Sequence, residues 1–209
     1  WSCVMSIVTY NNRSIANISA IPGAAKSLIH IKTLTASSSA NLSFIDGSSD
    51  VVLDSTYPIY LFKFINMHPA TDSALFQVNF RDGGSSYDAT KTSTYFYAQH
   101  GEDGNNGELV YSGTYDLAQS TSAQSISEIA GNANDESISG ELFLFNPSST
   151  TFVKHYMSQT NTYIPSNRST RVNVAGYCNV TAAIDGVQFA MSSGNIDAGT
   201  IKLYGLKDS

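Results

Sequence analysis

Charged residues are scarce in this chain. They make up 13% of its 209 residues, about half the share of an average soluble domain, and the 11 Lys and Arg residues nowhere form a cluster. Proteins that bind nucleic acid need a basic surface to neutralise phosphates, whereas this chain has a formal net charge of −6. The composition therefore argues against a nucleic-acid partner, and the acidic surface mainly favours solubility.

Cysteine is also rare. The chain has only Cys3 and Cys178, which lie at opposite ends of the sequence. Two such residues do not make the pattern of a disulfide framework. We expect both thiols to be unpaired, with Cys178 packed in a strand as a small hydrophobic residue.

Long apolar runs are missing as well. A membrane-spanning helix needs about 20 mostly apolar residues, and a secretory signal needs a shorter apolar run after a basic start. The sequence has neither pattern. We therefore expect no membrane partner and no export through an N-terminal signal.

What the sequence does have is strand and turn residues. It contains 12 Tyr and 10 Phe, with abundant Ser, Thr, Asn and Gly, and these types favour strands and turns. Near the end, Val187, Phe189 and Met191 alternate with smaller or polar residues, and Ile201 and Leu203 do so after a turn. This period of two predicts half-buried strands, and the last two are expected to form a closing hairpin. The predicted strands are 27–35 and 40–45, taken as a pair, then 58–66, 74–80, 91–100, 125–129, 137–145, 151–158, 170–181, 186–191 and 200–205, with 102–108 as a loop.

The strands follow one another at short spacing. No helical pattern separates them, and no repeat of 20–50 residues is visible. We predict an all-β fold, a jelly-roll-like sandwich of two sheets over residues 26–209. Residues 1–25 lack a regular pattern and are predicted to form a short extended N-terminal arm, which packs either on its own domain or on a neighbour.

Residues with catalytic or metal-binding chemistry do not cluster in the sequence. His30, His68, His100 and His155 stand singly, and no nucleophile or zinc motif occurs. The one metal candidate is a calcium site in the acidic loop 102–108, since hard cations take oxygen ligands. Its ligands would be Asp103, Asn105 and Glu108. We expect no enzymatic activity and no cofactor.

Several residues are candidates for an interface. Exposed Tyr supplies flat, amphipathic contact area that suits subunit contacts or sugar binding, although the pattern is more typical of Tyr at the rim of a core. Apolar residues in the arm suit contact with a neighbouring molecule. The candidates are Tyr10, Ile15, Ile18 and Ile21 in the arm, and Tyr95, Tyr97 and Tyr111 in the domain.

Parts of the amino-acid sequence resemble a known protein family. The C-terminal phrase SSGNIDAGTIKLYGL (192–206) is similar to the endings of phage tail and virion proteins, particularly those of marine and cyanobacterial phages. The likeness extends to 36–80, 137–160 and 172–199 and covers roughly residues 27–206. Members of this family often open like Met5-Ser-Ile-Val-Thr-Tyr, so the resemblance implies that residues 1–4 are an upstream extension.

The resemblance implies a function. It predicts a small β-sandwich virion structural protein, assembled in the host cytoplasm and bound to other phage proteins as a closed oligomer, for which we expect a homotrimer. A head decoration or cement protein is the favoured placement. A tail-fibre or tail-tip adhesin that recognises a host glycan is the alternative, and a free carbohydrate-binding module is a further one.

Overall fold

The computed structural model describes residues 28–207, and this part of the chain consists of β-strands and loops without a helix. The strands are β1 (Leu28–Thr35), β2 (Leu42–Ile45), β3 (Ile59–Pro69), β4 (Phe76–Arg81), β5 (Lys91–Gly101), β6 (Glu108–Tyr111), β7 (Gln124–Ser125), β8 (Ile138–Phe145), β9 (Lys154–Ile164), β10 (Arg168–Cys178), β11 (Gly186–Met191) and β12 (Ile196–Leu206).

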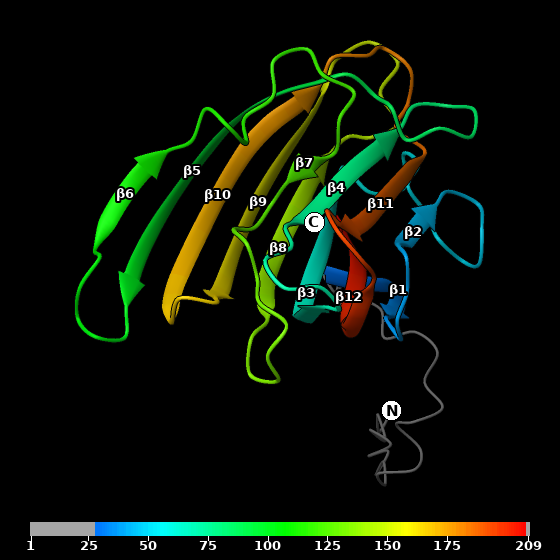
Figure 1. Ribbon diagram of the computed structural model, residues 1–209. Helices are drawn as coiled ribbons and strands as arrows, with labels where there is room; N and C mark the ends of the chain where they lie inside the picture. Colours follow the sequence, from blue (N-terminus) through cyan, green and yellow to red (C-terminus); the bar gives the residue numbers. More distant parts are fainter. Residues whose placement is uncertain (1–27, 208–209) are drawn as a thin grey trace, which may run out of the picture.

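The strands form two antiparallel sheets that pack face to face (Figure 1). The large sheet has the order β1-β12-β3-β8-β9-β10-β5-β6, and the small sheet has the order β2-β11-β4-β7. The small sheet lies in front of β3, β8 and β12, whereas β5 and β6 extend beyond it. The two faces of the large sheet therefore have different surroundings.

An aromatic cluster fills the space between the two sheets. Phe189 of β11 lies at its centre, with ring centroids 5.2–6.3 Å from those of Phe44, Phe62, Phe64 and Phe76. All five side chains are buried. Aromatic side chains bury much apolar area and pack well at such distances, so this cluster joins the sheets.

Beside β4, the inner face of the large sheet is covered by the segment 112–137, which contributes the short strand β7 to the small sheet and is otherwise a loop. Here the contacts are hydrogen bonds to the backbone of that segment. The Tyr95 hydroxyl donates to the Ser127 carbonyl at 2.9 Å, and the Thr160 hydroxyl donates to the Ile126 carbonyl at 2.5 Å. A buried loop needs partners for its backbone polar groups, and inward hydroxyls supply them.

The predicted fold class is confirmed: the described chain is an all-β sandwich of two sheets. Each predicted strand overlaps an observed one. The agreement is closest where inward residues are apolar, as for Phe76, Val78 and Phe80 in β4, all fully buried. Cys178 is buried as expected and forms no disulfide within residues 28–207, whereas Cys3 lies outside the described residues.

The predicted strand pairs at the two ends of the domain are wrong. β11 pairs with β2 and β4 in the small sheet, whereas β12 pairs with β1 and β3 in the large sheet, so they form no closing hairpin. For the same reason β1 and β2 are not a pair. Strands in facing sheets both alternate between an inward and an outward face, so alternation alone does not reveal which sheet a strand joins.

Several strand boundaries differ from the prediction, and β6 was not predicted as a strand; β3, for example, extends to Pro69 rather than ending at 66, and β12 begins at Ile196 rather than at 200. β6 begins at Glu108, at the end of the segment predicted as a loop, and β9 continues to Ile164 rather than ending at 158. The inward residues in the second half of β9 include Thr160 and Thr162, both buried. Their hydroxyls hide the apolar alternation by which strands are recognised in a sequence.

Candidate interaction surface

We call the face of the large sheet that points away from the small sheet the outer face. Two neighbouring rows of side chains cross it, because the strands pair in register from β1 to β5. Together these rows contain no Asp, Glu, Lys or Arg, and we call them the outer band. The first row is Leu28, Leu206, Ile59, Phe145, His155, Tyr177 and Thr92, and the second is His30, Tyr204, Leu61, Phe143, Met157, Ala175 and Thr94.

A polar row borders the outer band on one side. It includes Lys63 and Glu141, which form an ion pair at 2.7 Å, and then Gln159 and Asn173 on the next two strands. The change from apolar to polar occurs between adjacent rows, about 7 Å apart along each strand. The outer band is therefore a narrow stripe across the sheet.

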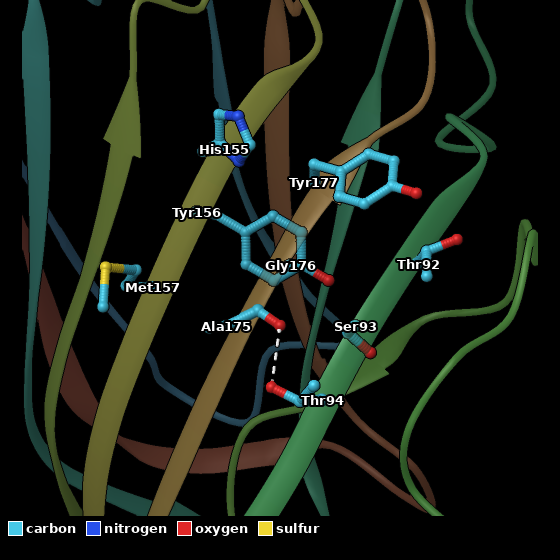
Figure 2. A pocket seen from close by; sticks show the side chains of 9 residues that line it. All are labelled: Thr92, Ser93, Thr94, His155, Tyr156, Met157, Ala175, Gly176 and Tyr177. Atoms are coloured by element: carbon cyan, nitrogen blue, oxygen red, sulfur yellow. Dashed lines mark hydrogen bonds between the residues drawn. The ribbon is translucent and has the colours of Figure 1, made fainter.

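The first pit in the outer band is shown in Figure 2 and has a volume of about 420 Å³. His155 and Tyr177 lie toward one end, with ring centroids 6.1 Å apart, and Thr94 lies toward the other. The Thr94 hydroxyl donates to the Ala175 carbonyl at 3.3 Å. Since the walls are mostly carbon, the first pit suits an aliphatic side chain or the flat face of a ring.

Gly176 forms part of the wall of the first pit. A Cβ at this position would lie 2.6 Å from the Tyr156 hydroxyl oxygen and 2.8 Å from the Thr92 carbonyl oxygen. The Tyr156 side chain, which is fully buried, therefore occupies the space on the inner side of Gly176. This close approach fixes the sheet backbone beneath the pit.

The second pit shares Met157 and Ala175 with the first and also has a volume of about 420 Å³. Its other walls include Ile59 and the rings of Phe143 and Phe145, which are stacked with centroids 6.3 Å apart. The second pit also reaches into the polar row and is lined there by Glu141, Gln159, Asn173 and Phe96. Met157 is 51% exposed. A methionine between two apolar pits gives an adaptable surface, because its side chain is unbranched and flexible.

A second apolar surface lies at the β5–β6 end of the outer face and adjoins the second pit, which Phe96 also lines. Leu109 is 73% exposed, Tyr111 is 59% exposed and Phe96 is 41% exposed. Phe96 faces Tyr111 directly across the two strands. We call these three residues the edge patch. The Tyr111 hydroxyl donates to Asp116 at 2.6 Å, which raises the pKa of Tyr111.

The predicted interface residues differ in how exposed they are in the structure. Tyr111 is exposed and belongs to the edge patch. Tyr95 is fully buried and Tyr97 partly buried, so Tyr95 is excluded as an interface residue. Odd-numbered residues of β5 point inward. The sequence Tyr95-Phe96-Tyr97 is aromatic at every position, so it does not show which of these side chains face the core. Tyr10, Ile15, Ile18 and Ile21, with the predicted arm, lie outside the described residues.

The predicted calcium loop makes internal hydrogen bonds. The Asp103 carboxylate accepts from the backbone N–H of Asn105 at 2.9 Å, and this contact lowers the pKa of Asp103. The Glu108 carboxylate instead accepts from the Gln99 side chain. Glu108 is thus used by the β5–β6 pairing. No group of three or more His, Cys, Asp or Glu residues suited to a metal ion occurs within residues 28–207.

One buried polar row escaped the sequence analysis. Lys154, Cys178 and Lys91 lie side by side on β9, β10 and β5, and all three are fully buried. The Lys91 ammonium donates to the Asn79 side-chain oxygen at 2.6 Å. Burial lowers the pKa of Lys91 to about 8 and raises the pKa of Cys178 to about 12. The sequence does contain a sign of this burial: each lysine lies an even number of residues from the buried residues of its own strand, so it points to the same, inward face.

The Lys154 ammonium donates to the carbonyls of Ser149, Val180 and Ala182 at 2.5–3.2 Å. Each buried lysine therefore holds loops at one end of the sandwich, and we assign both a structural role.

Comparison of the chain with protein-family models, with curated proteins and with solved structures finds no match. In the part of the chain that the structure covers, no helix is both long and apolar enough to cross a membrane. The two apolar surfaces of the outer face are therefore the features on which a functional proposal can be built.

Proposed function

We propose that this chain is a structural subunit of a bacteriophage virion, displayed on the particle surface as a head decoration or cement protein. The observation that carries the proposal is the edge patch. The patch lies on β5 and β6, the two strands at one edge of the large sheet, and a single subunit leaves its residues Phe96, Leu109 and Tyr111 exposed. Clustered apolar side chains at a surface favour contact with another protein.

The backbone at the same edge supports the proposal. Among residues 28–207, β6 pairs with β5 alone, over Glu108–Tyr111. An edge strand offers unpaired N–H and C=O groups to a neighbouring chain. An apolar patch beside such an edge combines hydrogen bonding with burial of apolar area, which suits a lasting contact between virion proteins.

The connectivity supports the finer proposal of a jelly roll. When the strand pairs β5–β6 and β9–β10 are set aside, the large sheet retains β1-β12-β3-β8 and the small sheet β2-β11-β4-β7. Eight strands in two four-stranded sheets, with the chain crossing repeatedly between them, is the arrangement of jelly-roll domains, which include capsid and lectin domains. The added strand pairs extend the large sheet and carry the edge patch.

A tail adhesin that binds host glycan is the second candidate, and the first pit favours it. Tyr177 and His155 offer ring faces, and Thr92 and Thr94 offer hydroxyls. Aromatic faces with nearby hydroxyls suit sugar rings. The same pit would serve a free carbohydrate-binding module, so a binding assay decides between these alternatives and decoration.

The test of the proposal uses the phage that encodes the chain. Density-purified particles are expected to contain the chain, and antibodies against it are expected to label the head. Particles from a deletion phage should bind added purified chain, as a closed oligomer for which we propose a trimer. A chain that is absent from purified particles would refute a virion role.

The edge patch is tested in the same add-back experiment. We expect the double variant Leu109→Asp and Tyr111→Asp to bind the stripped particles at least tenfold more weakly, because charge prevents burial of the patch. Phe152→Asp is the matched control, since Phe152 is 72% exposed on a loop outside the patch, and it should bind normally. A glycan-array hit that Tyr177→Ala removes would instead support the adhesin.

A further inference from the structure

The second pit joins the outer band to the polar row. On the side of the outer band, Phe143 and Met157 present apolar groups. On the other side, Glu141, Gln159 and Asn173 are register partners on β8, β9 and β10, and we call these three side chains the polar ladder. Neighbouring strands are about 4.8 Å apart, so the ladder is about 10 Å long. A ligand that fills the second pit therefore needs one apolar side and one side with several hydrogen-bonding groups.

The polar ladder has hydrogen-bonding groups that the chain itself leaves unused. Glu141 accepts from Lys63 through its Oε2 atom at 2.7 Å, and Gln159 accepts from Arg171 through its side-chain oxygen at 2.8 Å. Among residues 28–207, no partner occurs for Glu141 Oε1, for the Gln159 side-chain nitrogen or for either end of the Asn173 amide. The ladder therefore offers acceptors on Glu141 and Asn173 and donors on Gln159 and Asn173.

Mixed donors and acceptors beside an apolar wall suit a sugar ring. A hydroxyl both donates and accepts, so neighbouring hydroxyls can pair with a carboxylate oxygen and an amide NH₂ together. A pyranose with equatorial hydroxyls carries them at its rim and C–H groups on its two faces, which can lie on apolar or aromatic side chains. Phe96 continues the row of the ladder on β5 and is 41% exposed, so it adds an aromatic ring at that end. The volume of about 420 Å³ falls within the range of small-molecule sites, about 300–1,000 Å³.

The charges around the second pit favour a neutral ligand. Of the described residues that line it, Glu141 alone is charged. An anionic ligand would place a second negative charge beside this carboxylate, and like charges in contact are costly. A cationic ligand would compete with Lys63, which already forms an ion pair with Glu141 at 2.7 Å. A sugar without an acidic or amino group avoids both costs.

From these observations we infer that the second pit binds a neutral sugar with equatorial hydroxyls, of the β-glucoside type. One face of the ring lies on the outer band, and the hydroxyls at its rim bind the polar ladder. The site differs from the one that favours an adhesin, because it does not use His155 or Tyr177 of the first pit. The inference holds whether or not the chain is a virion subunit, since it rests on the lining of the second pit.

Titration of the full chain with methyl β-D-glucopyranoside tests the inference. In a chain with isotope-labelled methionine methyl groups, the NMR signal of Met157 should shift and saturate at millimolar sugar, because this side chain is 51% exposed and lines the pit. Met157→Leu identifies the signal by its loss. The corresponding methyl glucuronide carries a carboxylate in place of the CH₂OH group and should bind at least tenfold more weakly, because it would lie beside Glu141.

Variants separate the second pit from the rest of the outer face. The double variant Gln159→Ala and Asn173→Ala should weaken binding of the glucoside at least tenfold without changing thermal unfolding, because it removes both donors of the ladder. Asn161→Ala, exposed two residues further along β9, is the matched control and should bind normally. Tyr177→Ala, which alters the first pit, should also bind normally. No saturable shift, equal binding of the glucuronide, or loss of binding in Tyr177→Ala but not in the double variant would each overturn the inference.

Discussion

The inner face of the large sheet has two halves that are covered in different ways. Under the small sheet, the inward side chains are aromatic and aliphatic, as at Phe62 and Phe64. Under the segment 112–137, they include buried Ser158, Thr160 and Thr162. A sheet satisfies its own backbone hydrogen bonds, whereas a covering loop does not. Of these three hydroxyls, that of Thr160 donates to the Ile126 carbonyl of the segment, whereas that of Ser158 donates to the Glu141 carbonyl within the large sheet.

The polar half is also where the titratable groups are buried. The Tyr95 hydroxyl lies 3.0 Å from the Glu128 carboxylate as well as 2.9 Å from the Ser127 carbonyl and shares its one proton between these two acceptors. Burial raises the pKa of Glu128. The aromatic half also buries one titratable group, Tyr60, whose hydroxyl donates to the Asp54 carbonyl at 3.0 Å, but the phenylalanines at its centre carry none. We therefore expect substitutions in the aromatic half to act through lost packing, and those in the polar half through hydrogen bonds and protonation.

The largest effect is expected from Phe189→Ala in the aromatic half. The ring is fully buried among four other phenylalanines, and its removal leaves a cavity where both sheets meet. Such substitutions cost about 3–5 kcal/mol in the free energy of unfolding. Urea unfolding measures the change. Phe152→Ala, on an exposed loop, is the control and should change stability by less than about 0.5 kcal/mol. A cost below about 1 kcal/mol for Phe189→Ala would mean that the cluster does not join the sheets.

The next effect is a pH dependence from Lys91 in the polar half. The pKa of Lys91 is lowered from 10.5 to about 8 by burial. Between these values the unfolded chain keeps a proton that the folded chain has lost, so stability rises with pH. Relative to Lys91→Met, the natural chain should gain roughly 2 kcal/mol between pH 7 and 10.

Cys178 has the opposite effect and must be separated from that of Lys91. Its pKa is raised from 9.0 to about 12 by burial, so above pH 9 the unfolded thiol loses a proton that the folded thiol keeps, and stability falls. Measuring both Lys91 forms in a Cys178→Ala background removes this contribution. If the stability difference between the two forms does not change with pH, Lys91 is not buried as a titrating group.

The same contrast explains which parts of the structure could be predicted from the sequence. In β4 the alternation of Phe76, Val78 and Phe80 with polar residues identifies the strand and its inward face. In β8 the run Leu142-Phe143-Leu144-Phe145 is apolar in both phases, so alternation gives no orientation. That absence of phase is itself a signal, since it marks a strand with apolar side chains on both faces.

The candidate surfaces were less predictable than the strands. The outer band depends on register across strands that are far apart in the chain: Phe143, Met157 and Ala175 are neighbours only through the pairings of β8, β9 and β10. The connections between these strands differ in length, and no local sequence pattern shows which residues of the paired strands become neighbours. Tyr111 was predicted as an interface candidate because exposed tyrosines favour interfaces. Leu109, two residues earlier, was not predicted, because β6 begins inside the segment predicted as a loop and was not recognised as a strand.

The smallest effect, and the sharpest test of the comparison, comes from two threonines on one strand. The Thr160 hydroxyl donates to the Ile126 carbonyl, whereas the Thr162 hydroxyl is buried without a hydrogen-bond partner. Thr160→Val should therefore cost about 1–2 kcal/mol, because it leaves a buried carbonyl unpaired. Thr162→Val removes an unpaired hydroxyl and should be neutral or slightly stabilising. Both variants keep a β-branched side chain, so strand propensity hardly changes. Equal costs in urea unfolding would show that the segment 112–137 does not select the hydroxyls beneath it.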